Sequence, residues 1–249
     1  MAGRPRQFLE ESIQTIGLIG GLSWYSTAEY YRVLNEEVQQ RRGGHASASV
    51  ALQSLDFATV RACQERDDWQ AAGRLLADAG RRCEDSGADI VLICSNLMHK
   101  VADVVESALS LPLLHIADTV ADEARRRGWS RLGLLGTRWV TEEPFYVERL
   151  ARHGISVVTP SAKDRAMVDR VIFDELTQGR VDDESRREYV ETVARLALDG
   201  AESVVLACTE IEMLLDTQDT SVPLVDSMRV HALAAVDAAL EFAPIKNPE

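Results

Sequence analysis

Short apolar runs alternate with longer amphipathic stretches along nearly the whole chain. The runs are rich in Val, Ile and Leu, which is typical of strands in a parallel sheet covered by helices on both faces. We expect strands at residues 15–19, 47–52, 89–94, 111–115, 131–135, 156–159, 203–207 and 222–225, and helices at residues 27–42, 69–86, 117–127, 142–153, 164–178, 183–198 and 227–241. Ser26 and, three residues later, Glu29 have the spacing of a capping box and place the start of the first helix at residue 27. The alternation indicates an α/β fold.

Two segments of the first half recur in the second half in the same order. The run IGLIGG at residues 16–21 resembles LGLLGT at 132–137, and DIVLICSN at 89–96 resembles SVVLACTE at 203–210. Two unrelated strands would share apolar letters, but they would not share the residues at the strand ends, so a duplicated α/β unit explains the pattern better.

The repeat predicts two pseudo-symmetric α/β domains, each with a central, mostly parallel sheet flanked by helices and with the active site in the cleft between them. The boundary is expected near residues 115–130. Residues 1–115 together with 224–249 would form the first domain, with the final helix crossing back, and residues 116–223 the second.

Length and charge narrow the class of protein. A chain of 249 residues, 46% of them hydrophobic, suffices for one large domain or two smaller ones. Its apolar runs are far shorter than the roughly 20 residues of a membrane-spanning helix, and residues 1–11 contain no apolar segment of a secretory signal. The net charge of −13 disfavours nucleic acid as a partner. We therefore expect a cytoplasmic protein that binds neither membrane nor nucleic acid.

Lysine and cysteine usage narrows the chemistry. Only three of the 27 basic residues are lysines, Lys100, Lys163 and Lys246, so few amines could form a Schiff base or hold pyridoxal phosphate. The four cysteines contain no C-x-x-C pair, so their spacing supports neither a zinc site nor a redox dithiol. We expect free thiols, no metal and no cofactor.

Several strand ends carry residues that could bind a ligand, because open α/β sheets bind ligands at the carboxyl ends of their strands. The turn GLIGGLSW at residues 17–24 has neither the dinucleotide spacing nor a P-loop lysine. It is either a tight turn or a nest for a small anion. His115 ends another strand, and it is either a structural histidine or a catalyst. The sequence contains no G-x-S-x-G, H-E-x-x-H or Asp-rich phosphoryl-transfer motif.

The two repeated strand ends combine a thiol with polar neighbours, Cys94 with Ser95 and Asn96, and Cys208 with Thr209. A buried cysteine is often only a small hydrophobe, but a thiolate before a helix N-terminus is stabilised by the helix dipole. Neighbouring residues of a strand point to opposite faces, so only one of Cys94 and Ser95 can face a shared cleft.

Several motifs together resemble the aspartate/glutamate racemase superfamily, and most closely its amino-acid racemase branch. They are TIGLIGGLSWYST at residues 15–27, with EYYR at 29–32 and Asn35, then SNLMHKVAD at 95–103, LHIAD at 114–118, GLLGTR at 133–138, DEL at 174–176 and CTEI at 208–211. The resemblance covers residues 14–240 in the family's order.

The resemblance implies a cofactor-independent, homodimeric enzyme that holds a small amino-acid or dicarboxylate substrate between its halves. One acid/base residue from each half would face each side of the substrate α-carbon, and these positions map onto Ser95 and Cys208. The substrate-binding residues, by the same resemblance and by their place beside these two, would be Ser23, Trp24, Gln53, Asn96, Leu97, Lys163, Thr209 and Glu210, with Lys163 meeting a side-chain carboxylate.

The sequence departs from the family at two positions. Ser95 stands where the family has cysteine or threonine, and a serine hydroxyl is a far weaker acid than a thiol. Leu97 replaces what is commonly a small hydroxyl residue. The leading interpretation is a racemase of aspartate or glutamate. The alternatives are a single-cysteine decarboxylase, a maleate-type isomerase, and an amino-acid-binding protein that has lost turnover.

Overall fold

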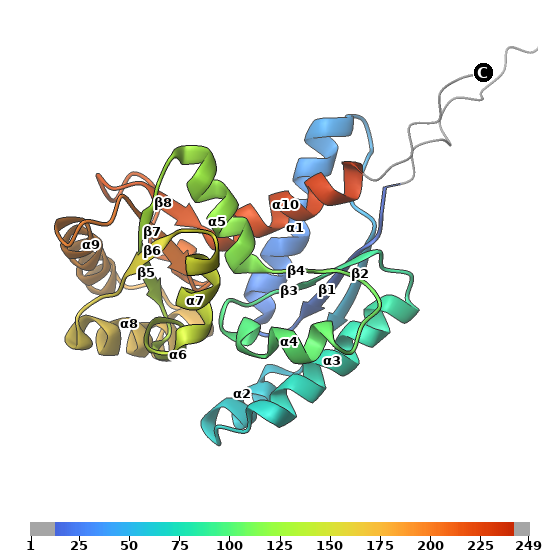
Figure 1. The fold of residues 1–249 in the computed structure, drawn as a ribbon, viewed down its shortest axis with the longest axis horizontal. Helices are drawn as coiled ribbons and strands as arrows, with labels where there is room; N and C mark the ends of the chain where they lie inside the picture. The colour runs from blue at the N-terminus through green and yellow to red at the C-terminus, as the bar shows by residue number, and fades with distance from the viewer. Residues whose placement is uncertain (1–12, 242–249) are drawn as a thin grey trace, which may run out of the picture.

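The computed structural model describes residues 13–241, which form two parallel four-stranded sheets, one in each half of the molecule (Figure 1). Strand order is β2-β1-β3-β4 in the first sheet and β6-β5-β7-β8 in the second, so the two halves repeat one topology. The strands are β1 (Ile16–Gly20), β2 (Val50–Ser54), β3 (Ile90–Ile93), β4 (Leu113–Leu114), β5 (Arg131–Gly136), β6 (Ser156–Val158), β7 (Ser203–Ala207) and β8 (Leu224–Asp226). The predicted pair of pseudo-symmetric α/β units is confirmed.

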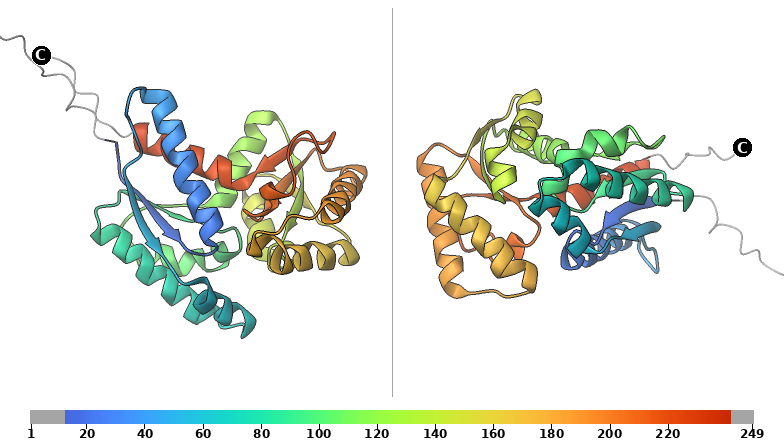
Figure 2. Two further views of the ribbon diagram at one scale, coloured as in Figure 1. Left: turned by 180° about the vertical axis from the view of Figure 1, so that it is seen from behind. Right: turned by 90° about the horizontal axis from the view of Figure 1, so that it is seen from below.

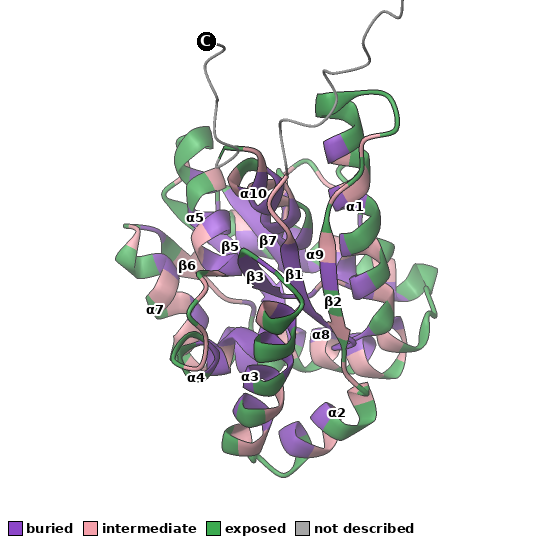
Figure 3. Ribbon diagram, turned by 90° about the vertical axis from the view of Figure 1, so that its right-hand side faces the viewer, coloured by how far each residue is buried: buried purple, intermediate pink, exposed green. Residues whose placement is uncertain are grey.

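Helices cover both faces of each sheet. The α-helices are α1 (Trp24–Arg42), α2 (Phe57–Glu65), α3 (Trp69–Asp85), α4 (Ala102–Glu106), α5 (Ile116–Arg127), α6 (Arg138–Glu142), α7 (Pro144–Arg152), α8 (Ala162–Asp174), α9 (Asp183–Leu198) and α10 (Ser227–Glu241); single 3₁₀ turns are η1 (Leu97–Val101), η2 (Leu176–Gln178) and η3 (Ile211–Met213). Strands β1, β3 and β7 are buried along their whole length and lie in the middle of the molecule (Figure 3). No helix within residues 13–241 is long and apolar enough to span a membrane.

The last helix of each half packs on the other half. Helix α10 follows β8 of the second sheet but packs against α1 of the first half and against α5, while α5 follows β4 of the first sheet and packs against α7 (Figures 1 and 2). Met228, Ala232 and Val236 of α10 share a core with Tyr30 and Leu34 of α1. The final helix therefore packs on the first half. Residues 224–226, which the sequence analysis placed in the first domain, pair with β7 in the second sheet.

The capping-box prediction for the first helix is wrong. Helix α1 begins at Trp24 with Ser23 as its N-cap, so Ser26 lies inside the first turn. Its hydroxyl does not cap the helix but donates a hydrogen bond to Glu210 in the other half. Ser26 therefore makes a hydrogen bond to the other half of the molecule in place of the expected capping bond.

The glycine turn after β1 is a close approach between two chain segments. Gly21 has φ +72°, and a Cβ there would meet the backbone oxygen and nitrogen of Leu55 at 2.0 and 2.5 Å. The amide of Leu55 donates to the carbonyl of Gly20 at 2.9 Å. The tight-turn interpretation accounts for this glycine, because a larger residue would push β2 and its following loop away.

Three buried histidines lie where β4, α5 and α10 meet, and each accepts a hydrogen bond through one ring nitrogen. His99 accepts from the amide of Ile116, His115 from the amide of Ala117, and His231 from the hydroxyl of Tyr30. A ring that accepts a hydrogen bond is neutral. Burial lowers the pKa of His115 and of His231 to about 3, and it lowers that of His99 as well. The structural interpretation of His115 is therefore favoured, since it caps α5.

These histidines predict acid sensitivity of the fold. In the unfolded chain each titrates near pH 6.5, so between about pH 6.5 and 3 the unfolded state binds protons that the folded state does not. The free energy of unfolding is expected to fall as the pH falls through this window. Urea unfolding at pH 7.5, 6 and 5 measures the slope. His231→Gln should flatten it, whereas the exposed His45→Gln should leave it unchanged; equal slopes in all three proteins would contradict the assignment.

Candidate active site

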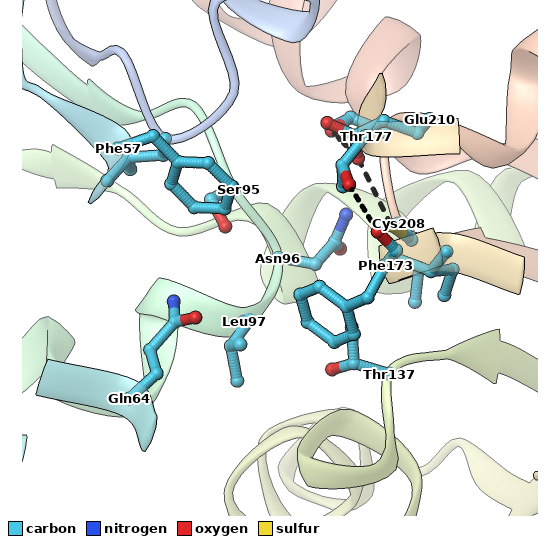
Figure 4. A pocket seen from close by; sticks show the side chains of 14 residues that line it. Phe57, Gln64, Ser95, Asn96, Leu97, Thr137, Phe173, Thr177, Cys208 and Glu210 are labelled. Carbon is cyan, nitrogen blue, oxygen red and sulfur yellow. Dashed lines mark hydrogen bonds between the residues drawn. The ribbon is translucent and has the colours of Figure 1, made fainter. Parts of the chain in front are cut away.

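A cavity lies between the two halves, at the carboxyl ends of their central strands (Figure 4). Its space not filled by atoms is about 410 Å³, part of it open to solvent. The first half contributes Leu22, Phe57, Gln64, Ser95, Asn96 and Leu97, and the second half contributes Thr137, Ile172, Phe173, Thr177, Ala207, Cys208, Thr209 and Glu210. We call this space the interdomain cavity.

Cys208 enters the cavity directly after β7 and is hydrogen-bonded to a carboxylate. Its Sγ donates to Oε2 of Glu210 at 3.1 Å. Burial raises the pKa of the Cys208 thiol, and the negative charge of Glu210 raises it further. The sequence expectation that a helix dipole lowers this pKa is wrong, because the helical segment that follows, η3, is a single turn. Cys208 therefore carries its proton in the free protein, beside a group that can receive it.

Glu210 is held by hydroxyl groups from both halves of the molecule. Its Oε1 accepts from Ser26 Oγ at 2.8 Å and its Oε2 from Thr209 Oγ1 at 3.0 Å, and the two hydroxyls are 2.5 Å apart. Ser26 lies on α1, whereas Thr209 and Glu210 follow β7. The carboxylate is thus buried yet fully hydrogen-bonded, as a buried charge must be.

Ser95, and not Cys94, lines the cavity on the other side. Cys94 lies in the apolar core with Ile16 and Leu92, where burial raises the pKa of its thiol. Ser95 follows β3, and its carbonyl accepts a hydrogen bond from Nδ1 of His99 at 2.7 Å. The alternation along the strand therefore selects Ser95, and Figure 4 shows its hydroxyl and Cys208 on different sides of the cavity.

Two polar residues between these walls differ in how they are held. Asn96 donates from Nδ2 to Ser227 Oγ at 2.9 Å and accepts at Oδ1 from the hydroxyl of Tyr146 at 3.0 Å, so its side chain is fixed in place. Thr137 follows β5, and its buried Oγ1 has no hydrogen-bond partner. An unsatisfied buried hydroxyl in a cavity wall is a ready contact for a polar ligand. The sequence analysis missed Thr137, although the repeat places it at a strand end.

Four of the expected binding residues do not line the interdomain cavity. Ser23 is buried beside it, while the indole of Trp24 is 63% exposed and stacks on Tyr25. Gln53 lies on β2, and Lys163 is exposed near the start of α8. Within residues 13–241, no group of three or more His, Cys, Asp or Glu side chains is arranged to hold a metal ion.

The fold agrees with that of known proteins. A family model described as Asp/Glu/Hydantoin racemase matches residues 19–235. The chain belongs to this family. A solved structure from Yersinia pestis assigned to the Asp/Glu racemases is 44% identical, with a TM-score of 0.86, over 92% of this chain and 100% of that one. An aspartate racemase homologue from Pyrococcus horikoshii OT3 is 28% identical, with a TM-score of 0.80, over 91% and 99% of the two chains.

A curated relative extends the range of activities found in the family. The broad specificity amino-acid racemase RacX of Bacillus subtilis (strain 168) is 20% identical over 228 residues, which are 91% of this chain and 99% of that protein. The predicted relationship to the racemase superfamily is confirmed, and the whole racemase fold is present, because these relatives match over nearly their full lengths.

Proposed function

We propose that this protein is a cofactor-independent amino-acid racemase in which Cys208 and Ser95 act on opposite faces of the substrate α-carbon. One observation carries the proposal: equivalent strand ends of two repeated halves bring a thiol and a hydroxyl to one cavity. Inversion requires a base on one face and an acid on the other, since removal and return of a proton on one face restores the same enantiomer. Each of the two repeated halves would supply the acid/base residue for one face of the substrate α-carbon.

The pair of Cys208 and Glu210 would be the stronger side. For Cys208 to act as a base, its proton passes from Sγ to Oε2 of Glu210, leaving a thiolate beside a neutral carboxylic acid. The thiolate then takes the α-proton, and the carbanion takes a proton on its other face. Glu210 is the one acidic residue that lines the described cavity, so it would also attract the substrate ammonium group.

Hydroxyls from both halves would hold the α-carboxylate, and the first half would supply the weaker acid. The free hydroxyl of Thr137 in the second half and the hydroxyl of Ser95 in the first can both donate to a carboxylate. Ser95, whose hydroxyl is a weak acid, would protonate the carbanion directly or through a water molecule. Aspartate and glutamate, the substrates favoured by the sequence, and the broader range of the Bacillus relative are both compatible with this arrangement of the α-groups.

The deciding experiment is a chiral assay of the purified protein in D₂O without pyridoxal phosphate, against all amino acids. Deuterium uptake at the α-carbon together with inversion supports a racemase. Release of CO₂ from malonate-like acids without exchange of amino acids indicates the single-cysteine decarboxylase, and isomerisation of maleate indicates the isomerase. Binding without exchange indicates a protein that has lost turnover.

Glu210→Gln tests the proton partner of Cys208. Turnover is expected to fall about 10²-fold, because the thiol loses its proton acceptor. Removing the negative charge also lowers the pKa of Cys208, so alkylation of this residue by iodoacetamide, followed by mass spectrometry, should begin at lower pH. Glu36→Gln, on the exposed side of α1, is the control and should change neither measurement. Loss of turnover with the wild-type alkylation profile would contradict the role.

We further propose that the protein works in the cytoplasm as a homodimer, as the family resemblance implies. Analytical ultracentrifugation of the purified protein tests the homodimer directly, and a monomer at micromolar concentration would contradict it.

A further inference from the structure

Apolar side chains from both halves form part of the lining of the interdomain cavity, which we call its apolar end. Phe57 of α2 and Leu97 of η1 come from the first half, and Ile172 and Phe173 of α8 come from the second. Figure 4 shows the rings of Phe57 and Phe173 turned toward the space that also contains Ser95 and Asn96. A substrate whose α-groups meet Cys208, Ser95 and Thr137 would extend its side chain among these apolar groups.

Arg61 lies beside these apolar groups but does not itself line the interdomain cavity. Its guanidinium stacks on Phe173, with Cζ 3.9 Å from the ring centroid. It also donates to Oε1 of Gln64 at 3.3 Å and forms an ion pair with Glu65 at 3.4 Å. Arg61 lines a neighbouring hollow that shares Phe173 with the cavity, and its charge is engaged there by Glu65 and the aromatic ring.

The lysine expected to meet a side-chain carboxylate is also elsewhere. Lys163 is exposed on the surface, and Arg165, two residues later, is bound to Glu142 at 3.0 Å and to the carbonyl of Pro160 at 2.7 Å. Among the described residues that line the cavity, Glu210 is the single charged one. A second carboxylate on the substrate would be buried between aromatic rings with no counter-charge, which is strongly unfavourable.

The polar group at the apolar end is neutral. Gln64 lies on α2, with its Nε2 3.2 Å from the Sδ of Met98 and its Oε1 accepting from Arg61. Contacts to sulfur are weak, so the amide can exchange this partner for a hydroxyl or amide of a ligand. Gln64 offers no full charge to balance a carboxylate.

We propose that the substrates are α-amino acids with uncharged, mainly apolar side chains, such as leucine and methionine, and that aspartate and glutamate are poor substrates. This inference rests on the proposed racemase function and names its substrate class. It differs from the sequence expectation at the side-chain end of the site and keeps the expectation for the α-carbon.

The test measures α-proton exchange in D₂O by NMR for both enantiomers of leucine, methionine, glutamine, aspartate and glutamate. Leucine and methionine are expected to exchange about 10²-fold faster than aspartate and glutamate at equal concentration. Exchange of aspartate or glutamate as fast as leucine overturns this inference while leaving the racemase function intact. Absence of exchange with every amino acid contradicts the racemase function, and the inference falls with it.

Leu97→Arg places a cation at the apolar end and tests the cause of the preference. The ratio of exchange rates for glutamate over leucine should rise at least about tenfold. Val104→Arg is the matched control, because Val104 is exposed on α4 outside the cavity, and its ratio should equal that of the wild type. If circular dichroism shows that Leu97→Arg does not fold, Phe57→Arg places a cation in the same cavity from α2 instead. An unchanged ratio in the folded variant overturns the inference.

Discussion

Replacing Cys208 by alanine is expected to lower racemisation by about 10²–10⁴-fold while leaving the fold intact. In the proposed mechanism this thiol gives its proton to Glu210 and then takes the α-proton, and an alanine side chain can do neither. Chiral chromatography of substrate incubated with each variant measures inversion, and thermal unfolding followed by circular dichroism confirms that the variant is folded. Full activity in folded Cys208→Ala would remove Cys208 from the mechanism.

Two other cysteines provide matched controls for this experiment. Cys63 lies in the core on α2, and Cys83 on α3 donates to the carbonyls of Leu18 and Ala51 at 3.6 and 3.5 Å. Burial raises the pKa of Cys83 to about 11, so this thiol stays protonated. Cys63→Ala and Cys83→Ala should lower stability slightly and leave turnover per folded molecule unchanged.

Ser95→Cys is expected to raise inversion, by as much as about 10²–10⁴-fold if the new thiol keeps the serine geometry. In the wild type the two faces differ in acid strength, so one enantiomer should exchange its α-proton quickly at Cys208 while net inversion lags behind. A thiol at residue 95 removes that difference. The ratio of inversion to deuterium uptake, measured from each enantiomer, is the quantity to compare.

Ser95→Ala and Cys94→Ala complete this comparison. Ser95→Ala should keep exchange at Cys208 and lose inversion, whereas Cys94→Ala removes a core thiol and should affect stability alone. If Ser95→Cys and Ser95→Ala both leave exchange and inversion unaltered, the acid on that face is another residue and the assignment of Ser95 fails.

The sheets and the two strand ends could be predicted because each depends on local pattern. Strands buried on both faces are apolar runs in the sequence, and the residues after such a run lie at the carboxyl edge of the sheet, as Cys208 does after β7. After β3 this rule left Cys94 and Ser95 as candidates, and the family resemblance singled out Ser95. Ser26 shows where a local rule fails, because a carboxylate distant in the sequence outcompeted the capping position. The strand ends could be predicted because they depend on the local sequence alone, whereas the contact of Ser26 depends on a residue far away in the sequence.

The apolar end of the site could not be predicted, because no strand end supplies it. Phe57 begins a nine-residue helix that was not among the expected elements, and Phe173 occupies one position on a longer helix. Which helix face meets the other half depends on how the halves pack, and that packing is set by the exchanged helices α5 and α10. The roles of Ser23, Trp24 and Gln53 stay predictions.

The hydrogen bond from Ser26 to Glu210 spans the boundary between the two halves at the acid/base pair itself. If the halves separate, Ser26 leaves Glu210, and a hydroxyl of the first half no longer orients the carboxylate beside Cys208. The first half therefore helps to position the acid/base pair that the second half carries. Closure of the two halves would then orient the group that receives the thiol proton and, in the same step, shield a carbanion from the protons of bulk water.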